Sequence, residues 1–217
     1  MTIAHTFHPE ILNDDQKATL LSLGTALKET DYYLADGTGL SLLLGHRLSI
    51  DLGWFTPELN NPESLFHRLS AGDISFTITS IAPQTVYIVL NNVQVSFIGY
   101  NYPLIEPRVF WPAYGCYLAS ISDIACMKLA ALASRGSRKD FFDLHRVLSD
   151  FYSLETLLKC YKEKYKNRDI GHVVRSLVYF QDAEAEPPTM MVKSVDWDKL
   201  KLDFESWVRE LHPLSED

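Results

Sequence analysis

The fold is decided by the stretch LADGTGLSLLLGHRLSIDLGWF, residues 34–55. The pattern predicts a short strand over 32–36, a tight turn at Gly37-Thr38-Gly39, a leucine-rich helix over 40–46 and a second strand over 49–55. Glycines in such a turn let the backbone approach a ligand, and the helix that follows offers free N–H groups to a phosphate. A plain tight turn explains the same residues, so both interpretations are open from this stretch alone.

The second of these strands carries a single carboxylate. Strict alternation places Ser49, Asp51 and Gly53 on one face of the strand. Acids at both 51 and 53 would point side by side at one metal ion, but residue 53 is a glycine. In the later strand 93–100, Ser96 occupies a polar position that can face inward. Asp51 is therefore a candidate metal ligand without a second acid beside it on its own strand.

The rest of the chain separates into an α/β part and a helical part. We expect helices over 14–29 and 62–69, and strands over 74–81, 85–90 and 93–100 with a hairpin turn at Asn91-Asn92. A proline-rich connector over 102–115 follows, and then helices over 122–135, 138–149, 153–166, 170–182 and 196–211. The fold class is therefore α/β (α+β), with an α/β core over 1–115 and a helical region packed on it over 116–217.

Composition limits the classes of function. The 217 residues are 47% hydrophobic, which is globular composition, and the net charge of −8 argues against general DNA or RNA coating. Leucine-rich stretches such as Leu40 to Leu44 are too short to span a membrane. The three cysteines match no zinc or redox motif, so we expect buried or idle thiols in a reducing cytoplasm.

Residues 135–175 are locally basic, with ten Lys/Arg against six Asp/Glu. Within them, 159–168 is either a solvated helix face or an RNA-facing surface.

The segment ISDIACMKLAALASRGSRKDFFDLHRVL, residues 121–148, is the most informative part of the helical half. Ser122 is expected to cap the first helix, and Ser137 the second. Lys128 and Arg135 are seven residues apart and fall on one helix face. In the next helix, Lys139 is spaced to pair with Asp143, and Asp140 lies one turn from Asp143. Two cations followed by paired acids can position a triphosphate, although a surface ladder of salt bridges would use the same residues.

These blocks together resemble a known family. The stretch 34–55, then VQVSFIGYNYPLIEP (93–107), then the helical segment, are similar in order to the AbiEii/AbiGii family of abortive-infection nucleotidyltransferase toxins from bacterial toxin–antitoxin systems. The resemblance covers about Tyr32 to Leu148. It implies a nucleotidyltransferase fold, with a small mixed sheet and flanking helices before a helical region. It also implies transfer of a nucleotide from an NTP with Mg²⁺ to an acceptor, often RNA, and a cognate antitoxin as partner.

The resemblance carries over residue by residue. Gly37 and Thr38 would form the phosphate-binding turn, and Asp51 would be the surviving metal ligand. Apart from the resemblance, Arg47 at the end of the helix before the Asp51 strand can touch phosphate, although favourable placement against the helix dipole explains it as well. The helical motif is matched by Lys128, Arg135, Lys139, Asp140 and Asp143. The family pattern has a glycine where this chain has Asp36, and acids where it has Gly53 and Ser96. Of three expected carboxylates, one remains.

Three hypotheses follow. The first is a nucleotide-binding protein with an eroded two-metal site and little or no transfer activity. The second is an active Mg²⁺-dependent enzyme in which Asp36 and Asp51 share the metal and Lys128 or Lys139 contacts the phosphates. The third is a non-catalytic component of a toxin–antitoxin pair that acts through the basic segment 159–168.

Overall fold

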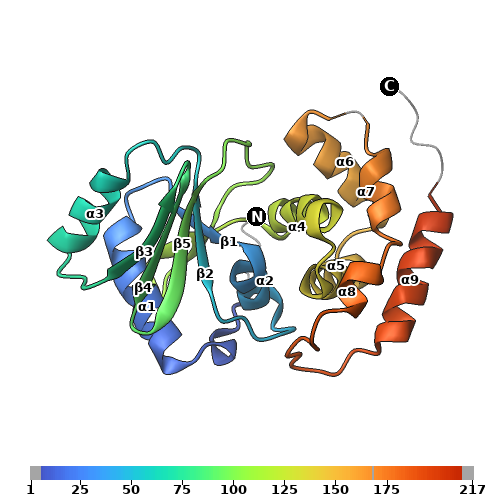
Figure 1. Ribbon diagram of the computed structural model, residues 1–217, viewed down its shortest axis with the longest axis horizontal. Coiled ribbons are helices and arrows are strands. Elements are labelled where there is room, and N and C mark those ends of the chain that lie inside the picture. The colour runs from blue at the N-terminus through green and yellow to red at the C-terminus, as the bar shows by residue number, and fades with distance from the viewer. Residues whose placement is uncertain (1–5, 168, 212–217) are drawn as a thin grey trace. The chain divides into compact units, whose positions relative to one another are not determined.

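The computed structural model describes residues 6–167 and 169–211. The chain divides into two compact units, Met1–Ser120 and Ile121–Asp217, and each is described separately. The first unit holds every strand of the described residues, and the second is helical (Figure 1).

The first unit is built on a seven-stranded mixed sheet with strand order β3-β4-β5-β2-β1-β7-β6. The central strands β1 (Tyr33–Ala35) and β2 (Leu52–Thr56) are antiparallel, while β2 runs parallel to β5 (Val93–Gly99), and β1 to β7 (Cys116–Leu118). The remaining strands are β3 (Thr77–Ala82), β4 (Thr85–Leu90) and β6 (Val109–Trp111). The β4–β5 hairpin turns at Asn91-Asn92, as expected, and both residues have the positive φ angles that such turns require.

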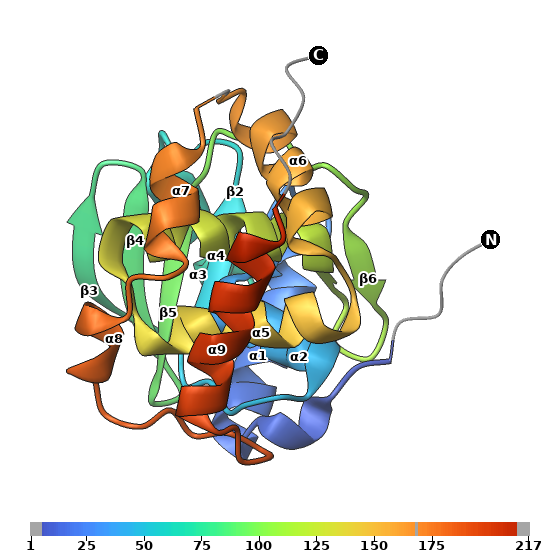
Figure 2. The same cartoon turned by 90° about the vertical axis from the view of Figure 1, so that its right-hand side faces the viewer.

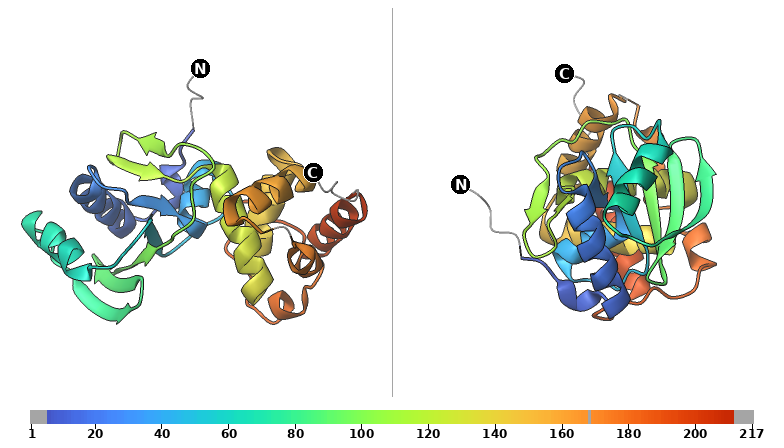
Figure 3. Two further views of the ribbon diagram at one scale, coloured as in Figure 1. Left: turned by 90° about the horizontal axis from the view of Figure 1, so that it is seen from above. Right: turned by 90° about the vertical axis from the view of Figure 1, so that its left-hand side faces the viewer.

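Helices cover both faces of this sheet. After the short 3₁₀ helix η1 (Pro9–Ile11), α1 (Asp14–Leu27) and α3 (Pro62–Ala71) lie on one side and α2 (Asp36–Leu44) on the other (Figures 1 and 3). A reciprocal capping box fixes the start of α1: the Asn13 side chain accepts from the Gln16 backbone N–H, and the Gln16 side chain accepts from the Asn13 N–H. Gly45, with φ of 60°, ends α2.

Three local expectations in this unit are wrong. Residues 37–39 are not a separate tight turn, because they form the first turn of α2 itself. The strand expected over 49–55 begins only at Leu52, and Ile50, two residues before it, is 74% exposed. The expected connector contains β6, and β7 follows it, because Val109, Trp111, Cys116 and Leu118 bury their side chains and pair across a short antiparallel ladder.

The second unit consists of the helices α4 (Ile121–Arg135), α5 (Arg138–Asp150), α6 (Leu154–Tyr165), α7 (Gly171–Ser176), α8 (Gln181–Glu184) and α9 (Trp197–Arg209) (Figure 2). The single helix expected over 170–182 is broken into α7 and α8. The break places the Phe180 ring at a tilt to that of Phe141, with 5.1 Å between the ring centroids, in an aromatic cluster that also holds Trp197 and Phe204. Ser122 lies inside α4 rather than at its cap.

Ser137 does occupy the N-cap position of α5, but its hydroxyl donates to the Glu186 carboxylate instead of capping locally. The same Glu186 oxygen accepts the Arg138 backbone N–H at 2.8 Å. The carboxylate therefore caps the helix from a distant part of the chain.

The cysteines are free thiols, and Cys116 and Cys126 are buried, in line with the expectation from sequence. Burial raises the pKa of Cys116 to about 12, so this thiol stays protonated and inert at neutral pH. Among the described residues, no helix is both long enough and apolar enough to cross a bilayer.

Candidate functional site

The first turn of α2 forms one corner of the candidate site. Asp36, the first residue of the helix, has a φ of 58°, in the left-handed region that favours glycine. The family pattern has glycine here, and this angle supplies the physical reason for that preference. An aspartate tolerates the conformation better than most residues. Asp36 therefore brings a half-buried carboxylate to a place where the backbone alone would prefer no side chain.

Gly53 and Ser96 are neighbours across the parallel pair β2 and β5, in direct register. A Cβ atom built at Gly53 would lie 3.7 Å from Ser96 Oγ and 3.7 Å from the Cβ of Asp36. The three positions at which this chain departs from the family pattern therefore meet at one point. Two of them contribute no charge there, because glycine has no side chain and serine has only a neutral hydroxyl.

Asp51 lies directly before β2 and is exposed. Its backbone carbonyl accepts a hydrogen bond from the Thr38 hydroxyl, which also lies 2.7 Å from the Ser49 hydroxyl. Thr38 is buried, with 2% of its surface exposed. Within the turn predicted to bind phosphate, the Thr38 hydroxyl thus holds the segment that carries Asp51.

Arg47 packs against the same turn of α2. It is 4% exposed, and one of its terminal nitrogens would lie 2.3 Å from a Cβ built at Gly37. Its other terminal nitrogen donates to the Leu48 carbonyl at 3.0 Å. A side chain at residue 37 would thus have to displace the end of the Arg47 side chain, whose guanidinium places a positive charge at this corner.

The residues present do not fit a family-type two-metal site. Paired metals about 3.5–4 Å apart need several converging carboxylates. Among residues 6–167 and 169–211, no group of three or more His, Cys, Asp or Glu side chains could hold a metal ion. The α/β unit offers Asp51, Asp36 and the Ser96 hydroxyl in this region, which is the ligand set of at most a single Mg²⁺ with substrate phosphates.

In the helical unit, the structure brings four predicted site residues together. Lys128 Nζ lies 2.9 Å from Asp140 Oδ1 and 2.9 Å from Asp143 Oδ2, and all three side chains are fully buried. Arg135 adds a two-pronged contact, with its Nε 2.9 Å and its Nη2 3.2 Å from the Asp140 carboxylate. The cluster is therefore an interior ion-pair network joining α4 to α5, not the surface ladder considered from sequence.

The expected pairing of Lys139 with Asp143 is not seen, because Asp143 is paired with Lys128 and Lys139 is exposed on α5. Of the two cations assigned to the phosphates in the second hypothesis, only Lys139 is accessible in this unit. The assignment of roles to Lys128, Arg135, Lys139, Asp140 and Asp143 stays a prediction.

The basic segment 159–168 is less basic at the surface than its sequence indicates. Lys164 is 1% exposed, and its Nζ lies 2.6 Å from Asp123 Oδ1. Lys159 pairs with Glu155 one turn earlier. A test of binding through this face must therefore reverse Lys162 and Lys166, because reversing Lys164 would break an internal ion pair.

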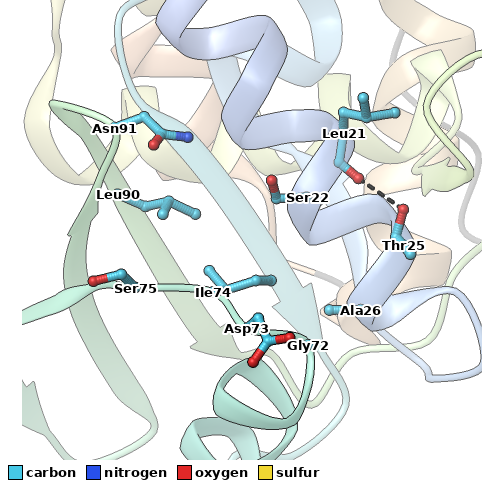
Figure 4. Close-up of a pocket in the computed structure, with 10 residues that line it drawn as sticks. All are labelled: Leu21, Ser22, Thr25, Ala26, Gly72, Asp73, Ile74, Ser75, Leu90 and Asn91. Carbon is cyan, nitrogen blue, oxygen red and sulfur yellow. Dashed lines mark hydrogen bonds between the residues drawn. The ribbon is translucent and has the colours of Figure 1, made fainter.

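A groove of about 510 Å³ lies elsewhere in the first unit, between α1, the connection from α3 to β3 and the β4–β5 turn (Figure 4). Leu21, Ile74 and Leu90 form its apolar surface, and Asp73 lies at its α3 end. No residue of the predicted site lines it, so it carries no argument about nucleotide chemistry.

Gln16 is a contributor that the sequence reasoning missed. Its side-chain amide donates to the Ser49 carbonyl at 2.6 Å, 33 residues away. The signal was present, because Asn13-x-x-Gln16 ahead of an apolar helix is a capping-box pattern and predicts a buried, oriented glutamine. Nothing in the sequence pointed to its long-range partner.

Comparison with known proteins agrees with this architecture. Residues 68–210 match the family model described as the nucleotidyl transferase AbiEii toxin of type IV toxin–antitoxin systems. An uncharacterised protein of Aquifex aeolicus (strain VF5) is 34% identical over 210 residues, covering 92% of this chain and 97% of the relative.

Solved structures share the fold at low sequence identity. A putative nucleotidyltransferase from Helicobacter pylori superposes with a TM-score of 0.57 at 18% identity, covering 91% of this chain and 95% of that one. MenT4, a nucleotidyltransferase toxin of Mycobacterium tuberculosis H37Rv, gives 0.56 at 15% identity, covering 92% and 87%. Because the family model spans more than half of the chain, this protein belongs to the AbiEii nucleotidyltransferase toxin family.

Proposed function

We propose that the chain binds a nucleotide in its α/β unit and carries out weak or no nucleotidyl transfer. The observation that carries this proposal is the direct pairing of Gly53 with Ser96, at the point where the family pattern places two acids. Arg47, Gly37 and the N–H groups of the first turn of α2 provide a corner suited to an anion.

The chemistry explains why binding and catalysis separate. Nucleotidyl transfer requires charge stabilisation on both the attacking oxygen and the leaving pyrophosphate, which paired metals supply. A single Mg²⁺ that keeps several waters can be bound by one or two carboxylates and the substrate phosphates. Asp51 and Asp36 can hold a single Mg²⁺ together with the substrate phosphates, but they offer too few ligands for paired metals.

The test is calorimetry with each of the four common NTPs and Mg²⁺, together with a labelled-NTP transfer assay. We expect measurable binding that Asp51→Ala weakens, and transfer near background. Glu29→Ala, an exposed acid on the same unit, is the matched control and should leave binding unchanged. Robust transfer that Asp51→Ala abolishes would refute the proposal.

The position of Asp36 favours a second candidate, an active enzyme with a relocated acid. Its Cβ is 3.7 Å from the point where a side chain at residue 53 would begin, so its carboxylate can serve the place that Gly53 leaves empty. In that case Asp36→Gly should lower transfer although it relieves the left-handed backbone. Unchanged or higher transfer would remove this candidate.

The partners that both candidates expect are an NTP with Mg²⁺, an RNA or protein acceptor, and a cognate antitoxin in the bacterial cytoplasm. Membership of a toxin family supports the antitoxin, and similarity to nucleotidyltransferase structures supports the nucleotide.

A further inference from the structure

The segment between α2 and β2 carries Asp51 but has almost no regular backbone pairing of its own. Ile50 is 74% exposed and Asp51 is exposed, so burial of these two side chains does not fix it. Two side chains from neighbouring helices bind its carbonyl groups: Gln16 of α1 donates to Ser49, and Thr38 of α2 donates to Asp51. The segment is thus held at two backbone atoms on either side of Ile50.

The geometry points to Gln16 as a positioning residue for Asp51. We propose that its amide holds the 49–51 segment so that the Asp51 carboxylate is already set for a metal–nucleotide complex. This inference rests on the proposed function, and it adds a residue of α1 that does not itself touch the ligand.

Both ends of the Gln16 side chain are engaged. Its oxygen accepts the Asn13 N–H at 3.0 Å, and its nitrogen donates to the Ser49 carbonyl at 2.6 Å. The side chain is 3% exposed. Rotating the amide by 180° would place oxygen against a carbonyl and NH₂ against an N–H, so the group has one satisfied orientation. The α1 capping box is thereby connected to the segment that carries the candidate ligand.

The two roles of Gln16 can be separated by mutation. Gln16→Glu keeps an oxygen for the Asn13 N–H but places a carboxylate, which cannot donate, against the Ser49 carbonyl. Asn13→Ala does the reverse: it removes the side-chain oxygen that accepts from the Gln16 backbone N–H and leaves the bond to Ser49 intact. Only Asn13→Ala removes a capping bond at the start of α1, and only Gln16→Glu removes the bond to the 49–51 segment.

The first measurement is amide hydrogen exchange of the full chain. We expect Gln16→Glu to raise exchange over residues 48–52 about tenfold, while Asn13→Ala raises it only at the start of α1. Lowering the pH protonates the introduced carboxyl, which then supplies a donor again, so the protection of 48–52 should return at low pH in Gln16→Glu alone. Equal exchange of residues 48–52 in the two variants would overturn the inference.

The second measurement is calorimetric affinity for Mg²⁺ with ATP, GTP, CTP or UTP. Loss of a group that orients a metal ligand typically costs 10–100-fold in metal affinity. We therefore expect at least about a tenfold loss in Gln16→Glu and less than about twofold in Asn13→Ala. Equal losses of affinity in Gln16→Glu and Asn13→Ala would contradict the positioning role of Gln16. If the unmodified chain binds none of the four nucleotides, the proposed function fails, and hydrogen exchange still decides the role of Gln16.

Discussion

Gly53 and Ser96 face each other on parallel strands, and a side chain added at residue 53 would press on the buried ring of Phe55. The nearest atom to a built Cβ is Phe55 Cε2, at 3.2 Å, on a ring that must shift by a few tenths of an ångström. Ser96 Oγ and Asp36 Cβ are at ordinary contact distance. A carboxylate at residue 53 therefore requires a small shift of the Phe55 ring, and its other two neighbours leave ordinary contact distances.

This leads to a prediction about restoring the acids. In Gly53→Asp/Ser96→Asp, two new carboxylates join Asp36 and Asp51, so mutual repulsion should lower the stability of the metal-free protein. Mg²⁺ should then stabilise the variant, because a ligand that binds only the folded state raises its melting temperature. We take 10 mM MgCl₂ as about a hundred times the dissociation constant. At that ratio, binding should stabilise the folded variant by roughly 2.7 kcal/mol, which is measured as an increase in Tm.

The matched control is Gln94→Asp, which adds an exposed acid on the same face of β5, two residues from Ser96. Its melting temperature should respond to Mg²⁺ as that of the unmodified chain does. If the double variant gains no more than this control, the acids at 53 and 96 do not converge on a metal.

At the scale of elements, α4 and α5 are joined by a buried charge network. Lys128 of α4 lies between two carboxylates of α5, with no exposed surface on any of the three. Lys128→Ala would leave Asp140 and Asp143 buried without their shared cation. Breaking such a pair typically costs about 3–5 kcal/mol. We expect a loss of that size in the free energy of unfolding, measured by urea denaturation.

Lys139→Ala is the control for this prediction, because Lys139 is the exposed lysine next to Asp140 and should change stability by less than about 0.5 kcal/mol. Comparable losses in the two variants would contradict the interior network. Such a result would favour a surface ladder of salt bridges, which the spacing of these residues also allows.

The sequence predicted the elements well where one periodic pattern was long. The helices over 122–135, 138–149, 153–166 and 196–211 are found within a few residues, because each has a continuous apolar face. β6 and β7 were missed because strands of three residues among prolines give too little alternation to detect. The break between α7 and α8 depends on Phe180 reaching Phe141, a contact that no local pattern contains.

The site was predicted to a smaller extent than the fold. Family resemblance identified positions 36, 53 and 96, and the structure brings them together. The burial of Lys128 and Lys164 was not foreseen, because lysine spacing along a helix is the same for a solvated face and for an internal ion pair. The bond from Gln16 to Ser49 spans 33 residues and follows only from tertiary packing.

At the scale of the whole molecule, the division into Met1–Ser120 and Ile121–Asp217 predicts two cooperative unfolding units. Each unit offers a substitution that should destabilise that unit and not the other. Lys128→Ala removes a cation from the helical unit. Gly24→Ala affects the α/β unit, since a Cβ at this residue of α1 would lie 1.9 Å from the Tyr114 backbone oxygen. Overpacking of this kind costs about 1–3 kcal/mol.

We therefore expect two transitions in differential scanning calorimetry, with Lys128→Ala lowering one and Gly24→Ala the other. For units of this size, Tm should fall by roughly 4–8 °C for each kcal/mol lost. Leu21→Ala, which truncates a 53% exposed side chain on α1, is the control and should move neither transition by more than a few degrees. Each variant lowering both transitions together would show that the chain unfolds as one cooperative body. A nucleotide that binds the α/β unit alone should, by the same reasoning, raise only the transition that Gly24→Ala lowers.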